Sequence, residues 1–158
     1  MSNAFPPSPQ HDWLKKNTGD WIVECAYFMA PGEDPIEVEG KEFNDMLGEF
    51  WSIGRFEADL LGSPMVGQSS IGYDPVKKLF VSTWKDSSTP FHYTFAGSLD
   101  EEKNALFFEG ENYDPVRQEV SIYRSKINFL SDEERVLSLS VEAGGSEIPI
   151  LEYRYKRA

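Results

Sequence analysis

Gly19-Asp20-Trp21 separates two kinds of sequence in this chain. Before it, residues 8–18 read as a short helix, with Ser8 as the N-cap and Pro9 at the first helical position. Gly19 is expected to end this helix, because glycine readily adopts the left-handed conformation. After it the apolar residues recur with a period near two, which is typical of strands. The order of elements predicts one N-terminal helix followed by an all-β chain.

Segments rich in β-branched and aromatic residues make up the rest of the chain, and turn residues separate nearly every pair. They cover residues 21–28, 36–43, 50–60, 65–73, 79–84, 91–97, 105–110, 120–129, 135–143 and 148–155. Connections this short join antiparallel neighbours, because parallel strands need a long crossover. We therefore expect a single antiparallel β-barrel of about ten strands, or a sandwich. Residues 1–7 are read as a flexible arm and residues 8–158 as one barrel domain.

Two details of the strand pattern carry structural predictions. Tyr73-Asp74-Pro75-Val76 returns as Tyr113-Asp114-Pro115-Val116, and Asp-Pro favours tight turns between antiparallel strands. Within residues 50–60, Trp51 and Phe56 fall on opposite faces of a regular strand. A β-bulge at Gly54 would turn both toward the core, so a bulge is predicted there.

Composition excludes several classes of partner. The chain has 158 residues and a formal charge of −12, which disfavours nucleic acid and anionic membrane surfaces. No apolar run approaches the roughly 20 residues that span a bilayer, and no secretory signal is visible. Cys25 is the only cysteine, which fits a reducing compartment. The sequence therefore predicts an acidic, cytoplasmic protein.

No catalytic or metal-binding motif stands out. His11 and His92 lie on distant segments, and neither has a second ligand at a metal-site spacing. Cys25 lies in an apolar strand and is read as a buried structural thiol. The acidic group Glu37, Glu39 and Glu42 is read as a solvated strand face. We expect no cofactor and no metal.

The aromatic residues are more suggestive, because they fall on different strands and would line one lumen. Core filling is the competing interpretation, since buried aromatic residues usually serve packing. A pocket combines apolar walls with a few polar anchors. The candidate ligand-binding residues are Trp51, Arg55, Phe56, Tyr73, Trp84, Asp86, Phe95 and Arg124.

Gly-x-Trp after a short helix resembles the first-strand signature of the calycins, which include lipocalins and fatty-acid-binding proteins. That resemblance implies a C-terminal arginine packed over Trp21, and Arg157 is the first candidate. Nearly the whole chain resembles the bacterial domain of unknown function 1579 family, through residues 62–67, 72–74, 84–87 and the final Tyr155-Lys156-Arg157. It departs from that family at Leu47-Gly48-Glu49, where a Gly-Gly pair is expected. The resemblance implies a lipocalin-like barrel and no particular activity.

Three functional hypotheses follow. The first is noncatalytic binding of a small, largely apolar molecule in the lumen. The second is a structural or interaction module with a filled barrel, acting as a homodimer. The third, an enzyme with Asp86 and His92 as acid or base at the barrel mouth, is the least favoured because no motif supports it.

Overall fold

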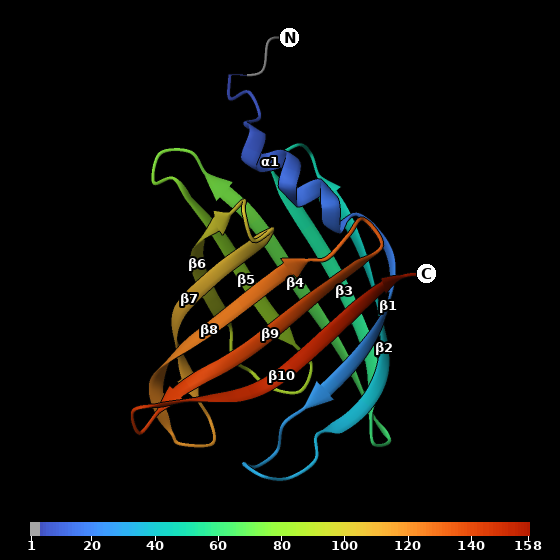
Figure 1. Ribbon diagram of the computed structural model, residues 1–158, viewed down its shortest axis with the longest axis vertical. Coiled ribbons are helices and arrows are strands. Elements are labelled where there is room, and N and C mark those ends of the chain that lie inside the picture. The colour runs from blue at the N-terminus through green and yellow to red at the C-terminus, as the bar shows by residue number, and fades with distance from the viewer. Residues whose placement is uncertain (1–3) are drawn as a thin grey trace.

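The computed structural model describes residues 4–158 and shows a closed ten-stranded antiparallel barrel with a short helix at one end (Figure 1). The helix α1 spans Pro9–Leu14 and continues into a 3₁₀ turn over Lys15–Asn17. The strands are β1 Gly19–Tyr27, β2 Ile36–Leu47, β3 Trp51–Leu60, β4 Ser63–Asp74, β5 Leu79–Asp86, β6 Tyr93–Asp100, β7 Ala105–Asp114, β8 Glu119–Phe129, β9 Glu134–Ala143 and β10 Ser146–Arg157. The expected barrel is confirmed, and all ten expected strands are present.

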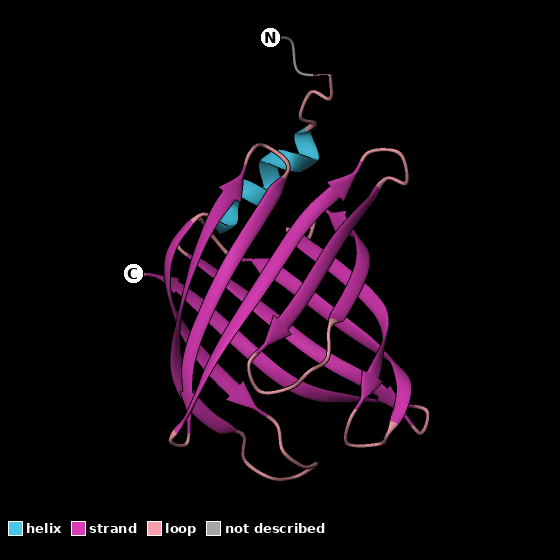
Figure 2. Ribbon diagram, turned by 180° about the vertical axis from the view of Figure 1, so that it is seen from behind, coloured by secondary structure: helices cyan, strands magenta, loops and turns pink. Residues whose placement is uncertain are grey.

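Each strand pairs with its successor, and β1 pairs with β10 to close the barrel. The strands of the two walls cross steeply (Figure 2), as closure of a twisted sheet requires. Trp21 sits at the seam, opposite Arg157 on β10 and Glu42 on β2. Each of the two strands that flank β1 therefore places one residue opposite Trp21.

The predicted bulge at Gly54 is wrong, because β3 runs in continuous register with both neighbours. The register shifts instead on β10, between Pro149 and Leu151. Proline has no backbone N–H to give to the ladder, so an irregularity there is the expected solution. Strand β3 accordingly keeps Trp51 and Phe56 on opposite faces.

The helix covers the end of the barrel where β1 begins (Figure 1). Ser8 is its N-cap and Pro9 its first residue, as predicted, and the Ser8 backbone N–H donates to Nδ1 of His11 at 2.8 Å. Thr18 is the C-cap of the 3₁₀ turn, and Gly19, the next residue, is the first residue of β1 and has a φ of +119°. Gly19 therefore directly follows the helix C-cap with a positive φ, as expected, although it also begins β1. A Cβ there would lie 2.6 Å from Nη1 of Arg157, so glycine leaves room for that guanidinium.

The repeated Asp-Pro segments form equivalent turns after β4 and β7. Asp74 accepts hydrogen bonds from the backbone N–H groups of Val76 and Lys77, and Asp114 does the same for Val116 and Arg117. Each carboxylate thereby fixes the turn that starts from it.

Two apolar clusters occupy the interior. One lies under α1, which contributes Leu14, and the other surrounds Trp21 and Phe56. Residues 4–7 carry no helix or strand, and residues 1–3 of the expected arm lie outside the described residues. Among the helices described, none is both long and apolar enough to cross a membrane.

Candidate functional site

The barrel encloses a cavity of about 450 Å³ that reaches from the polar groups near α1 toward the loops at the opposite end. Met29, Thr89, Val116 and Pro149, from four of those loops and strand ends, contribute to its wall. Most of its lining is apolar or aromatic, and its volume falls in the range of about 300–1,000 Å³ typical of small-molecule pockets. The lumen is therefore not filled by side chains.

Aromatic side chains form much of this lining. Trp84 reaches inward from β5 and its Nε1 donates to Oδ2 of Asp86 at 2.8 Å. Tyr93 and Tyr123 meet edge to face, with ring centroids 5.6 Å apart. The hydroxyls of Tyr27 and Tyr153 are 2.6 Å apart.

These tyrosines are uncharged hydrogen-bonding groups. Burial is the main cause that raises the pKa of Tyr27, Tyr123 and Tyr153 above the ordinary value for a phenol. They therefore present neutral hydroxyls to the lumen at physiological pH. A neutral hydroxyl both donates and accepts hydrogen bonds.

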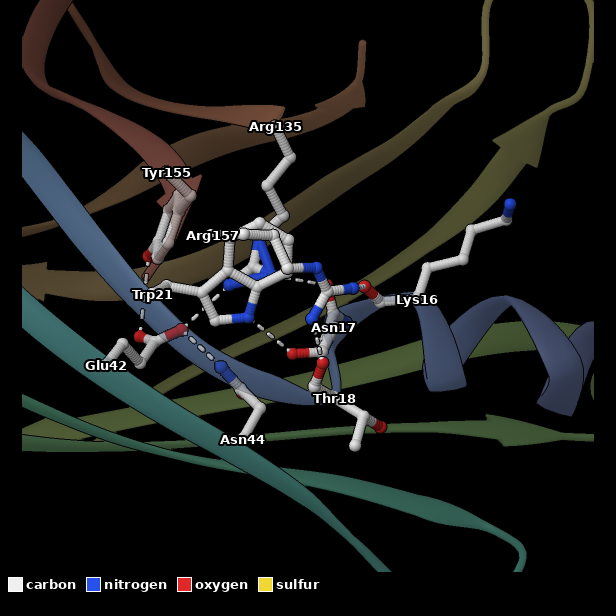
Figure 3. A network of polar contacts seen from close by, with 9 residues as sticks. All are labelled: Lys16, Asn17, Thr18, Trp21, Glu42, Asn44, Arg135, Tyr155 and Arg157. Atoms are coloured by element: carbon white, nitrogen blue, oxygen red, sulfur yellow. Dashed lines mark hydrogen bonds and ion pairs between the residues drawn. The ribbon is translucent and has the colours of Figure 1, made fainter. Parts of the chain in front are cut away.

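A buried polar network closes the end of the cavity near α1 (Figure 3). Arg135 Nη2 donates to Oε2 of Glu42 at 2.8 Å, and Nη1 donates to Oδ1 of Asn17 at 2.7 Å. Asn44 Nδ2 donates to the same Glu42 oxygen at 2.7 Å, and the Tyr155 hydroxyl lies 3.4 Å from Oε1. The Arg135 and Glu42 side chains are only 5% and 4% exposed, so the ion pair is buried and well supplied with partners.

Trp21 lies beside this network, next to Arg135 and Arg157 (Figure 3). The Arg157 guanidinium lies 4.1 Å from the indole centroid and that of Arg135 lies 4.6 Å from it. Arg157 also donates to the backbone carbonyls of Lys16 and Thr18, and Trp21 Nε1 donates to the carbonyl of Asn17. The predicted packing of Arg157 over Trp21 is confirmed, and it ties the helix end to both terminal strands.

Toward the opposite end, two carboxylates have structural partners. Asp114 is buried and its Oδ2 lies 2.8 Å from Nη1 of Arg117. Burial opposes ionisation of Asp114, but hydrogen bonds from Arg117 and the turn amides outweigh it and hold its pKa below the usual range. Asp86 accepts hydrogen bonds from Trp84 and from the backbone and hydroxyl of Ser88. Both carboxylates hold loop structure beside the cavity.

Of the candidate residues chosen from sequence, Trp84, Asp86 and Phe95 line the cavity. Phe56 and Tyr73 lie inside the barrel within the packed core. Phe56 stacks on Tyr153 with centroids 5.1 Å apart, and Tyr73 packs edge to face with His11 under the helix. These two side chains support the walls.

Trp51, Arg55 and Arg124 lie on the outer surface, so their expected place in the lumen is wrong. Trp51 is 41% exposed and covers Gly72, while Arg55 pairs with Glu57. Arg124 bridges Glu109 and Glu142 at 3.0 and 2.9 Å. Strand alternation is the cause: without a bulge at Gly54 it sends odd-numbered residues of β3 outward, and on β8 it places Arg124 on the face opposite the cavity-lining Tyr123 and Ser125.

Sequence reasoning missed Glu42 and Arg135, the centre of the buried network. Glu42 was grouped with solvated Glu37 and Glu39, but it is only 5% exposed. Its position was a usable signal, because alternation along β2 places residue 42 on the face opposite residues 37 and 39. Its partner on β9 is far away in sequence and could not be identified that way.

The histidines and the cysteine have no shared site. His92 is exposed, and His11 is buried in the helix cap. Within the described part of the chain, no three histidine, cysteine or acidic side chains gather as metal ligands. Cys25 is 2% exposed, and burial raises the pKa of its thiol to about 12, which confirms a buried, unreactive thiol.

A closed antiparallel barrel with a helix across one end and a lumen behind it belongs to the class of lipocalin-like barrels. Comparison with family models gives the particular family. The chain belongs to the family described as "Protein of unknown function (DUF1579)", whose model matches residues 6–157. The resemblance noted in the sequence is thereby confirmed.

Solved structures agree on the fold. Rv2717c from M. tuberculosis superimposes with a TM-score of 0.70 at 15% identity, covering 97% of this chain and 99% of that one. The S-type phycobiliprotein lyase CPES from Guillardia theta gives 0.65 at 9% identity, covering 94% and 92%. The protein EF1p2_mFAP2b, solved bound to DFHBI, gives 0.50 at 11% identity, covering 94% and 98%.

A curated relative matches only in part. An uncharacterized protein of Haemophilus influenzae is 27% identical over 56 residues, which is 35% of this chain. The match spans 18% of that protein's length.

Proposed function

We propose that this protein binds a small, largely apolar molecule in the barrel lumen and performs no chemistry on it. The observation that supports the proposal is the cavity of about 450 Å³ in the lumen, which Trp84, Phe95 and Tyr123 help to line. An apolar cavity of this size has no structural purpose of its own, because empty interior volume costs stability. A bound molecule would recover the lost contacts.

The carboxylates near the open end support binding over catalysis. Asp86 is engaged by Trp84 and Ser88, and Asp114 by Arg117, so each already serves local structure. His92, the other residue considered as an acid or base, lies exposed in the loop between β5 and β6. A structural neighbour solved bound to DFHBI supports the view that this barrel shape can accompany a bound small molecule.

Filling the lumen tests the proposal. Ser125 on β8 lines the cavity, and Ser125→Phe would occupy space that a ligand needs. Ser138 pairs with Lys126 on the outer face, so Ser138→Phe adds the same ring without entering the lumen. Titration of the uncharged dye Nile red should give saturable binding to wild type and to Ser138→Phe, and at least tenfold weaker binding to Ser125→Phe.

Tryptophan emission gives a second readout, because Trp84 lines the lumen and Trp51 does not. The change in tryptophan emission on ligand binding should be retained in Trp51→Phe and lost in Trp84→Phe. Native mass spectrometry of gently purified protein would give the mass of any molecule retained from the host. Equal dye affinity of the two phenylalanine variants, with no retained mass, would refute lumen binding.

One observation favours the hypothesis of an interaction module. Phe43, Leu47 and Trp51 expose apolar surface on the outer faces of β2 and β3. Sedimentation would reveal a homodimer, and Trp51→Glu should dissociate it if this surface is the contact. The cavity nevertheless contradicts the filled barrel that this hypothesis assumed.

A further inference from the structure

The charged side chains that line the cavity are already satisfied within the protein. The charged residues of the lining are three carboxylates and two guanidiniums: Glu42, Asp86, Asp114, Arg117 and Arg135. Their formal charges sum to −1. Glu42 pairs with Arg135 and Asp114 with Arg117, each at 2.8 Å. Asp86 accepts from Trp84 and Ser88. An anionic ligand would therefore enter a lumen that offers it no free cation, because both guanidiniums are paired and the remaining charge is the Asp86 carboxylate.

Arg135 is the group that would otherwise attract an anion. It lies at the closed end of the cavity, but its two Nη atoms are engaged by Glu42 and Asn17. Its faces are occupied as well, because Tyr155 and Trp21 lie 3.9 and 4.6 Å from its guanidinium carbon. An anionic headgroup would have to displace Glu42, which would leave that carboxylate buried without its partner.

The remaining polar lining is neutral. The side chains of Ser82, Ser125 and Tyr123 belong to the cavity wall and carry neutral hydroxyls. Such hydroxyls suit an alcohol or carbonyl group on a ligand. Moving an unpaired ion out of water costs far more than moving a hydroxyl that finds a partner.

We propose that the lumen is selective for uncharged amphiphiles, molecules with an apolar body and a hydroxyl or carbonyl group, over anions of the same size. This inference rests on the proposed lumen binding and names the chemical class of the ligand. The selectivity follows from the internal ion pairs, and Glu42 is its main determinant because it neutralises Arg135.

Two ten-carbon probes separate charge from shape: decanol and decanoate. At pH 8 the carboxylic acid is ionised. Each is measured by displacement of Nile red from the wild-type protein. Decanol should bind at least tenfold more tightly than decanoate. Equal affinity of decanol and decanoate would overturn the inference while leaving lumen binding intact.

Glu42→Gln tests the assigned determinant, since it keeps the side-chain shape and removes the charge that neutralises Arg135. The ratio of decanol to decanoate affinity should fall at least tenfold in this variant. Glu39→Gln on the exposed face of β2 changes the net charge equally and should leave the ratio as in wild type. An unchanged ratio in folded Glu42→Gln would overturn the role of Glu42. If Glu42→Gln does not fold, the wild-type comparison decides the selectivity by itself. Failure of Nile red and both probes to bind wild type would instead refute the proposed function.

Discussion

Replacing Arg135 by methionine should destabilise the barrel strongly, because it leaves the Glu42 carboxylate buried without its cation. Removing one partner of a buried ion pair costs about 3–5 kcal/mol. Here the guanidinium also supports Asn17 through a 2.7 Å hydrogen bond and lies 3.9 Å from the Tyr155 ring. Since small proteins are stable by only about 5–15 kcal/mol, a loss of this size is easily measured.

The same network predicts how two substitutions combine. If Glu42→Leu and Arg135→Met each cost about 3–5 kcal/mol, independent effects would sum to about 6–10 kcal/mol. The double variant has no unpaired charge, and its remaining cost comes mainly from the Asn17 and Asn44 amides that lose a partner. We expect it to lose about 4 kcal/mol, a coupling of at least about 2 kcal/mol.

Urea unfolding followed by circular dichroism measures these free energies. Arg124→Met is the matched control, because Arg124 also contacts two carboxylates, at 3.0 and 2.9 Å, but on the exposed outer face. Its loss should be far smaller, since exposed ion pairs contribute little. Equal losses for Arg135→Met and Arg124→Met, or a double variant equal to the sum of its singles, would refute this account of the network.

Two further predictions concern single side chains. The free energy of unfolding should fall as pH rises from about 9 to 12, because folding raises the Cys25 thiol pKa from 9.0 to about 12 and only the unfolded chain releases that proton in this range. Cys25→Ala should flatten this pH dependence, measured by urea unfolding between pH 9 and 11, by up to about 1.4 kcal/mol per pH unit. An unchanged slope would contradict the assignment. Asp114→Ala should lower the free energy of unfolding, measured with urea, by about 1.5–3 kcal/mol, because Asp114 is buried and paired with Arg117. Asp74→Ala at the equivalent turn is the control and should cost clearly less. Equal losses would show that the ion pair adds no stability.

The strand and turn pattern determined the architecture without any structure. Short segments with alternating apolar residues and the two Asp-Pro turns predicted an antiparallel meander. The structure shows ten strands, each paired with its neighbours in sequence. The pairing of Trp21 with Arg157 followed from a resemblance carried by residues at the two ends of the chain. These features depend on local geometry or on a short motif, both of which can be read from the sequence.

Which face of each strand points inward was decided only by closure of the barrel. On β3 both faces carry apolar residues, so alternation alone could not choose between Trp51 and Phe56, and the assumed bulge at Gly54 gave the wrong answer for Trp51. The buried ion pair depends even more on tertiary structure. Glu42 resembles a surface acid until β9 places Arg135 beside it, because an isolated carboxylate avoids burial and a paired one tolerates it.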